Sequence, residues 1–110
     1  MFTRAELEAV LPVVHAAVPP TPQFAWPLLK TRTGIDVVVK HENHTPTGAF
    51  KVRGGIVYAD RLKRERPQVK GVVTATRGNH GQSLAFACGD RKSTRLNSSH
   101  HLTSRMPSSA

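Results

Sequence analysis

The chain is 110 residues long, with a hydrophobic fraction of 38%, a mean hydropathy of −0.33 and a formal net charge of +9. This length allows one small domain with a limited core, and no apolar run approaches the ~20 residues that a membrane-spanning helix needs. The N-terminus lacks the basic and apolar regions of a secretory signal, which favours the cytoplasm, and the single cysteine, Cys88, excludes an internal disulfide and is expected to be a small buried hydrophobe.

A helix is predicted from the N-terminus to about Ala17. Thr3 and Glu6 fit a capping box, in which each side chain accepts a hydrogen bond from the backbone N–H of the other residue. Apolar residues then recur at helical spacing, at Leu7, Val10, Leu11 and Val14. Pro12 falls inside this pattern and is expected to kink or split the helix.

A proline-rich segment, residues 18–22, interrupts the helical pattern. Its composition favours a rigid connector over the alternative of a polyproline ligand for a partner protein. Residues 24–30 are expected to form a short helix or an irregular apolar segment that ends at Gly34. The β-branched residues of the following stretch, 35–42, predict a strand.

A second long helix is predicted from about Ala49 until Pro67. Gly54 and Gly55 fall inside it, and each glycine costs roughly 1 kcal/mol relative to alanine in a helix. A glycine pair at this place therefore indicates close approach of another backbone or of a ligand. A second strand over residues 69–75 and a further helix follow, and this alternation predicts a parallel sheet in an α/β fold.

The positive charge is concentrated at the end of the second helix. Residues 1–89 hold twelve of the sixteen basic and six of the seven acidic residues, which leaves a net charge of +6 there. Much of it lies in residues 61–66, where cations are favourable because of the helix dipole. Without stacking aromatic residues, this cluster predicts a solvated helix end and no nucleic-acid partner.

Two polar turns join the predicted strands to the helices that follow them. The first carries Pro46 and Gly48 and places Lys51 in the first turn of a helix. The second, residues 76–80, has the sequence Thr-Arg-Gly-Asn-His. Unpaired N–H groups at helix N-termini bind anions. A lysine beside such groups indicates a site for an anionic cofactor with a reactive carbonyl.

These turns carry a family resemblance. Residues 47–54, Thr-Gly-Ala-Phe-Lys-Val-Arg-Gly, resemble the Schiff-base motif of pyridoxal-phosphate enzymes of the tryptophan synthase β type (fold type II), and serine/threonine dehydratases above all. Residues 76–82, Thr-Arg-Gly-Asn-His-Gly-Gln, resemble the same family's Ser-x-Gly-Asn-His loop. The resemblance covers roughly residues 2–88 and implies an incomplete α/β fold-type-II unit with parallel strands and flanking helices.

The resemblance also implies roles for individual residues. Lys51 would bond covalently to pyridoxal 5′-phosphate and then remove the α-proton of a serine- or threonine-like substrate, which goes on to a 2-oxo acid and ammonia. Phe50 would lie against the cofactor and Asn79 would hydrogen-bond its 3′-oxygen. The substrate carboxylate would be bound by the loop of Thr76, Gly78, Asn79 and His80. The parent protein would be a homo-oligomer acting on a small-molecule amino acid, with no membrane partner.

Alternatives remain for several of these residues. Lys51 could be a surface lysine, and Asn79 could serve as a helix N-cap. Arg77 stands where dehydratases have a small residue and racemases a serine, which argues against racemisation; it would pair with a second substrate carboxylate or point to solvent. Threonine synthase, cysteine synthase and racemase types are the alternatives within the family. Outside it, the chain could be a basic interaction module or an unstable fragment.

The histidines do not favour a metal site. His41 and His44 lie three residues apart in a polar turn, and no cysteine or carboxylate completes a tetrahedral set with them or with His80.

The last part of the chain differs in composition. Residues 90–110 show no helical or strand period, which predicts disorder. Residues 90–100 and 104–110 also resemble a translated sequencing adapter, so we expect an N-terminal lyase fragment over residues 1–89 and an artefactual tail over residues 90–110. No run of four glycines, typical of the family's phosphate-binding loop, occurs. The chain is therefore expected to bind the cofactor weakly and to be inactive alone.

Overall fold

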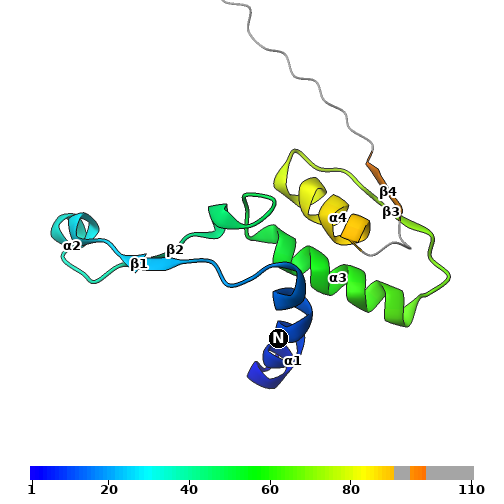
Figure 1. The fold of residues 1–110 in the computed structure, drawn as a ribbon, viewed down its shortest axis with the longest axis horizontal. Coiled ribbons are helices and arrows are strands. Elements are labelled where there is room, and N and C mark those ends of the chain that lie inside the picture. The colour runs from blue at the N-terminus through cyan, green and yellow to red at the C-terminus, as the bar shows by residue number, and fades with distance from the viewer. Residues whose placement is uncertain (91–94, 99–110) are drawn as a thin grey trace, which may run out of the picture.

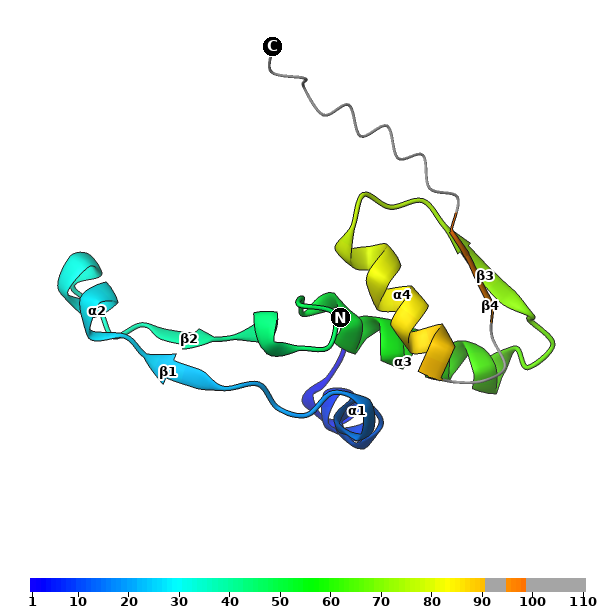
Figure 2. The ribbon, with the colours of Figure 1, turned by 45° about the horizontal axis from the view of Figure 1, so that its top comes forward.

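The structure is a computed structural model that describes residues 1–90 and 95–98. Three helices, α1, α3 and α4, lie together, while a narrow arm formed by β1, α2 and β2 extends away from them (Figure 1). The view in Figure 2 shows β3 and β4 side by side along α4, at the end of the molecule opposite to the arm. In chain order the elements are α1 (Arg4–Ala17), β1 (Gln23–Ala25), α2 (Pro27–Thr33), β2 (Val38–Lys40), the 3₁₀ turn η1 (Glu42–His44), α3 (Lys51–Glu65), β3 (Gly71–Thr74), α4 (Asn79–Asp90) and β4 (Arg95–Ser98).

The capping box predicted for α1 is confirmed. The Thr3 N–H donates to a Glu6 carboxylate oxygen at 2.6 Å, and the Glu6 N–H donates to the Thr3 hydroxyl at 3.2 Å. The helix runs without a break through Pro12 to Ala17, so of the two expectations, a kink or a split, the split is wrong. Pro12 has no N–H group, so the Glu8 carbonyl has no backbone donor in the helix. Glu8 and Pro12 are both exposed, so water can solvate that carbonyl.

The arm is an antiparallel pair of strands closed by a short helix. Gln23, Phe24 and Ala25 of β1 pair with Lys40, Val39 and Val38 of β2. Pro27 starts α2, a position that suits proline because its missing N–H would be unpaired there. Gly34 ends the helix as predicted, in the left-handed conformation at φ 75°.

The α/β class with parallel strands and flanking helices is confirmed, but the expectation that the predicted strands 35–42 and 69–75 share one parallel sheet is wrong for the described residues. β2 pairs with β1, and β3 pairs in parallel with β4, which gives two separate two-stranded sheets. β2 pairs with β1, a strand close to it in sequence, and β3 pairs with none of the preceding strands. Residues 95–98 were expected to be unstructured, but they pair with the backbone groups that β3 would otherwise leave open at its edge. The remainder of the expected disorder, residues 91–94 and 99–110, lies outside the described residues.

The core lies between α3, α4 and the end of α1. It is made of one cluster of buried apolar residues: Val18, Val52, Ile56, Ala59 and Ala87. Cys88 is buried beside them at 3% exposure, as predicted.

The prediction of close backbone approach at the glycine pair is confirmed for Gly55. A Cβ atom added there would lie 2.2 Å from the Ser83 hydroxyl oxygen and 3.0 Å from the Ser83 carbonyl oxygen. Gly54 has open space in the same position. Gly55 is therefore the residue that lets α3 and α4 pack backbone to backbone.

The basic end of α3 is solvated, as predicted. Arg61 pairs with Glu65 at 2.7 Å and Arg64 with Asp60 at 3.0 Å, both one helical turn apart, and both arginine side chains are about 70% exposed. Exposed pairs of this kind contribute little to stability. Within the described part of the chain, no helix has the length and apolar character needed to span a membrane.

Candidate active site

The loop before α3 is a tight turn that delivers Phe50 and Lys51 to the start of the helix. The Gly48 N–H donates to the Thr45 carbonyl at 2.9 Å, and Gly48 takes a φ of +67°, which favours glycine. The Ala49 N–H donates to the Thr45 hydroxyl at 2.9 Å. Thr45 and Ala49 are both buried. The buried Thr45 side chain therefore holds the turn on its inner side. After Ala49 the chain leaves the turn at the exposed Phe50.

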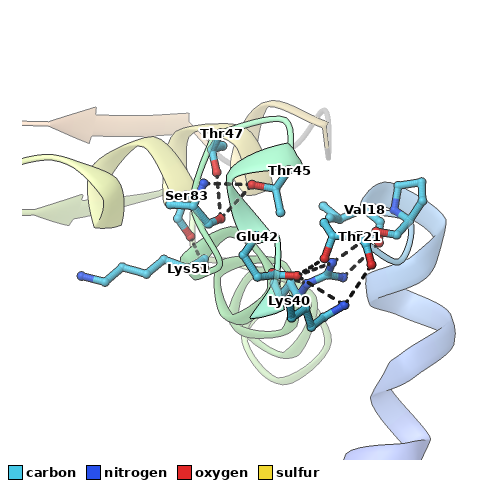
Figure 3. A network of polar contacts seen from close by, with 11 residues as sticks. Val18, Thr21, Lys40, Glu42, Thr45, Thr47, Lys51 and Ser83 are labelled. Atoms are coloured by element: carbon cyan, nitrogen blue, oxygen red, sulfur yellow. Dashed lines mark hydrogen bonds and ion pairs between the residues drawn. The ribbon is translucent and has the colours of Figure 1, made fainter. Parts of the chain in front are cut away.

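Lys51 is the first residue of α3, where the sequence predicts it. Its side chain is exposed and runs away from the neighbouring polar network, as Figure 3 shows. Phe50 precedes it and is 64% exposed. Both side chains border an open groove of about 1020 Å³ that runs between the start of α3, β3 and the N-terminal part of α4. The other residues that line the groove are Phe2, Arg53, Gly54, Gly55, Tyr58, Val72, Val73, Thr74, His80 and Leu84.

The turn before α4 is capped by Thr76. Its hydroxyl accepts the N–H groups of Gly78 at 3.2 Å and Gly81 at 3.3 Å. The Gly78 carbonyl accepts from Gly81 and Gln82, so Gly78 is the N-cap and Asn79 the first helical residue. The alternative of Asn79 as the N-cap is therefore wrong. Among the described residues, the N–H groups of Asn79 and His80 have no hydrogen-bond partner and remain available to an anion.

The structure brings some of the predicted site residues into one groove and leaves others beside it. Lys51, Phe50 and His80 line the groove together. Thr76, Gly78 and Asn79 form the adjoining turn and are not among the lining residues. The roles assigned to these residues from the resemblance stay predictions, although their placement is consistent with one shared site.

A second polar cluster behind Lys51 was not predicted from the sequence. Arg53 binds both carboxylate oxygens of Glu42, at 2.7 Å and 3.1 Å, and donates to the carbonyls of Val18 and Pro19, each at 3.2 Å (Figure 3). The arginine hydrogen bond, ahead of other causes, lowers the pKa of Glu42 to about 2. Arg53 thereby joins α3 to η1 and to the connector after α1.

Two further side chains complete this cluster. The Thr21 hydroxyl donates to Glu42, and it also helps to lower the glutamate's pKa. The Lys40 ammonium lies 3.6 Å from the Glu42 carboxylate and 3.4 Å from the Thr21 carbonyl oxygen. The base of the arm is thus fixed to the start of α3 by charge and hydrogen bonds. Nothing in the local sequence marks Glu42 and Arg53 as partners.

The histidines of the loop take part in an aromatic cluster. The Trp26 indole N–H donates to His41 Nε2 at 3.2 Å, and the rings of His41 and His44 lie 6.0 Å apart, edge to face. Phe24 also contacts the His41 ring. In the part of the chain that the structure describes, no group of three potential metal ligands comes together.

Residues 14–94 match the family model of pyridoxal-phosphate dependent enzymes. The chain belongs to this family. It is 34% identical over 87 residues to the biosynthetic L-threonine dehydratase of Lactococcus lactis, an alignment that covers 79% of this chain and 21% of the relative.

Two solved structures are similar in fold to this chain. An aspartate racemase dependent on pyridoxal 5′-phosphate aligns with a TM-score of 0.78 and 29% identity, over 87% of this chain and 30% of that protein. A threonine deaminase from T.th. aligns with a TM-score of 0.73 and 26% identity, over 89% of this chain and 33% of that protein. The chain therefore spans about a fifth of the curated relative and a third of each solved structure.

The groove fits one end of the family's cofactor. Lys51 supplies a primary amine for the aldehyde, and the exposed ring of Phe50 supplies an apolar face beside it. The N–H groups of Asn79 and His80 add donors at a helix N-terminus. The residues present would therefore hold the aldehyde end of pyridoxal phosphate, while the chain has no glycine run of the kind expected for its phosphate.

Proposed function

We propose that residues 1–89 are part of a cytoplasmic, homo-oligomeric ammonia-lyase that depends on pyridoxal phosphate. Its substrates are serine- or threonine-like hydroxy amino acids, and its products are a 2-oxo acid and ammonia. The observation that carries the proposal is the position of Lys51, at the first residue of α3 and on the wall of a groove that it shares with Phe50 and His80.

The proposed roles are those that the resemblance implies, and this geometry supports them. When bound, pyridoxal phosphate supplies the electron sink that stabilises negative charge at the substrate α-carbon. Lys51 holds the cofactor through Nζ and, once the substrate amine has displaced it, takes the α-proton. Its exposed side chain has no ion pair among the described residues, so the amine is free to move between these tasks.

The N-terminal turn of α4 is the proposed place of the substrate carboxylate. The unpaired N–H groups of Asn79 and His80 point out of a helix N-terminus, which favours a negative charge. The Thr76 hydroxyl already occupies the N–H groups of Gly78 and Gly81. In this proposal Thr76 shapes the turn, and the two N–H groups that follow Gly78 bind the ligand.

Arg77 supports a second candidate substrate class, amino acids with two carboxylates. It is exposed in the turn before α4, and its guanidinium has no ion pair among the described residues. The aspartate racemase that aligns with the chain is named for such a substrate. L-aspartate and L-serine would be titrated into the full chain while the amide signals of Asn79 and His80 are followed by NMR. A preference for aspartate that Arg77→Ala abolishes would support this class.

Reductive labelling tests the main proposal directly. The full chain is mixed with millimolar pyridoxal 5′-phosphate, reduced with borohydride, and digested so that the modified lysines are located by mass spectrometry. Lys51 is expected to be labelled about tenfold faster than the exposed lysines Lys30, Lys63 and Lys70, because the groove concentrates the reagent beside it. Equal labelling of all four would overturn the proposal.

Absorbance gives a separate measure of affinity. Because the chain has no glycine run for the cofactor phosphate, micromolar pyridoxal 5′-phosphate is expected to produce only a weak band with this chain. A stoichiometric band that Lys51→Arg removes would contradict the expectation of weak binding. It would still support Lys51 as the reactive residue.

A further inference from the structure

Ser83 is a buried hydroxyl on α4 that bonds to the first residue of α3. The residue is 1% exposed, and its Oγ donates to the carbonyl oxygen of Lys51 at 2.6 Å. A buried hydroxyl needs a hydrogen-bond partner, since leaving it unpaired costs free energy. Among the described residues, the Lys51 carbonyl is the only one that Ser83 Oγ reaches as a donor. The buried Ser83 hydroxyl therefore depends on the Lys51 backbone for its hydrogen bond.

The packing around this hydrogen bond leaves little freedom. Gly55 faces Ser83 so closely that any side chain at position 55 would displace the serine. Gly55 also lies four residues after Lys51 in α3, so regular helix geometry directs its N–H at the Lys51 carbonyl. The serine hydroxyl and the glycine N–H thus converge on the same oxygen atom, from two different helices.

The position of Ser83 links the two halves of the candidate site. Ser83 lies one helical turn after Asn79, on the helix whose N-terminus carries the free N–H groups. Lys51 lies at the other end of the hydrogen bond, and its side chain leads away from Ser83 (Figure 3). Lys51 is one of the residues that line the groove. Ser83 itself is not among the residues that line the groove. Its effect on the site would therefore be exerted through Lys51.

We propose that Ser83 is a positioning residue for Lys51, whose buried hydroxyl holds the lysine backbone against α4 and so fixes the amine relative to the N-terminal turn of that helix. The inference rests on the proposed function, in which these two groups serve one reaction. A slide of α3 along α4 would change their separation. The hydrogen bond resists that slide at the lysine itself, 32 residues away in sequence.

Three variants of the full chain separate the hydrogen bond from packing. Ser83→Ala removes the hydroxyl and leaves a small space. Gly55→Ala combined with Ser83→Gly also lacks the hydroxyl but changes the packing in the opposite direction, since the new methyl group would lie 3.0 Å from the carbonyl oxygen of residue 83. Cys88→Ala is the matched control, since it removes one buried side-chain atom from the same helix without a bond to Lys51.

The first measurement is independent of any cofactor. The NMR order parameter of the Lys51 backbone N–H is compared with that of Lys63 in the same helix. It is expected to fall from about 0.85 toward 0.6 in Ser83→Ala and in the double variant, and to stay unchanged in Cys88→Ala. An unchanged value for Lys51 in the two variants that lack the hydroxyl would overturn the inference.

The second measurement is the labelling of Lys51 relative to Lys63 by pyridoxal 5′-phosphate and borohydride. The ratio is expected to fall roughly fivefold in both variants without the hydroxyl and to stay constant in Cys88→Ala. A lower order parameter of the Lys51 N–H with an unchanged labelling ratio of Lys51 to Lys63 would overturn the positioning role. A wild-type chain that shows no preference for Lys51 would overturn the proposed function alone, because the order parameter still decides whether Ser83 holds the lysine backbone.

Discussion

Arg53 and Glu42 form a bidentate ion pair beside the start of α3, where Lys51 of the candidate site lies. The two Arg53 nitrogens lie 2.7 Å and 3.1 Å from the two glutamate oxygens, and the side chains are only 21% and 18% exposed. The same guanidinium reaches the carbonyls of Val18 and Pro19. A planar fork of donors suits this task, which a lysine could not perform. One side chain thus holds three segments of the chain at the base of the arm.

The first prediction concerns stability in acid. The pKa of Glu42 is about 2 in the folded chain and 4.5 ordinarily, so the charged form stabilises the fold above pH 4.5. This contribution should be lost as the pH falls from about 4.5 to 2. Because the pair is partly solvated, we expect about 2 kcal/mol near pH 6.5. The free energy of unfolding in urea would be measured for the wild type and Glu42→Gln, and the difference should vanish near pH 2.

Glu65→Gln provides the control for this measurement. Glu65 also pairs with an arginine, but its side chain is 56% exposed. Its loss should cost less than about 0.5 kcal/mol at any pH. A constant difference between wild type and Glu42→Gln from pH 6.5 to 2 would count against the ion pair as the source of stability.

The second prediction concerns the geometry of the arginine. Arg53→Lys keeps the charge but cannot bind both carboxylate oxygens and two carbonyls, so it should cost about 1–2 kcal/mol of unfolding free energy. A double-mutant cycle with Glu42→Gln should give a coupling energy of about 1–3 kcal/mol, as expected for residues in one network. Additive effects of the two substitutions would show that the pair is not energetically coupled.

Local features of the fold could be predicted from the sequence. The capping box joins Thr3 and Glu6, three residues apart, and the turn with Pro46 and Gly48 places Lys51 at a helix start. Each depends on neighbours in the chain, so the residue types carry the information. The place of Lys51 at the start of a helix and the turn before α4 were predicted correctly for that reason, whereas their roles in a site stay predictions.

Features that depend on distant partners could not be predicted. Arg53 meets Val18 across 35 residues, and Ser83 meets Lys51 across 32. Neither pair leaves a periodic signal. The prediction of strand pairing was wrong for the same reason. The pattern that predicts β2 and β3 as strands does not indicate which strand each of them pairs with. Only the glycine pair hinted at a tertiary contact, through the cost of glycine in a helix.

The third prediction concerns the close contact between Gly81 and Thr76. A Cβ atom at position 81 would lie 2.4 Å from the threonine Cγ2 atom. Gly81→Ala should therefore destabilise the chain by about 1–3 kcal/mol. Adding Thr76→Ser removes the methyl group but keeps the capping hydroxyl, so the double variant should regain most of this loss. Thermal or urea unfolding would measure each step.

Gly54→Ala is the matched control for this pair. Gly54 has open space where a Cβ atom would be and lies within α3, so alanine should raise stability by about 0.5–1 kcal/mol. If Thr76→Ser fails to rescue Gly81→Ala, the threonine methyl group is not the source of the clash.

The last prediction concerns the turn that presents Lys51. Gly48 has a φ of +67° with open space around its Cβ position, so Gly48→Ala should cost about 1–2 kcal/mol through backbone strain alone. Gly48→Asn should cost less, because asparagine tolerates this conformation. Gly34→Ala is the control, since Gly34 has a similar φ of 75° but lies at the end of α2 on the arm. The rate of hydrogen exchange should therefore rise in residues 51–55 for Gly48→Ala. For Gly34→Ala it should rise only in α2. Equal exchange rates at the start of α3 in both variants would mean that the turn does not hold Lys51.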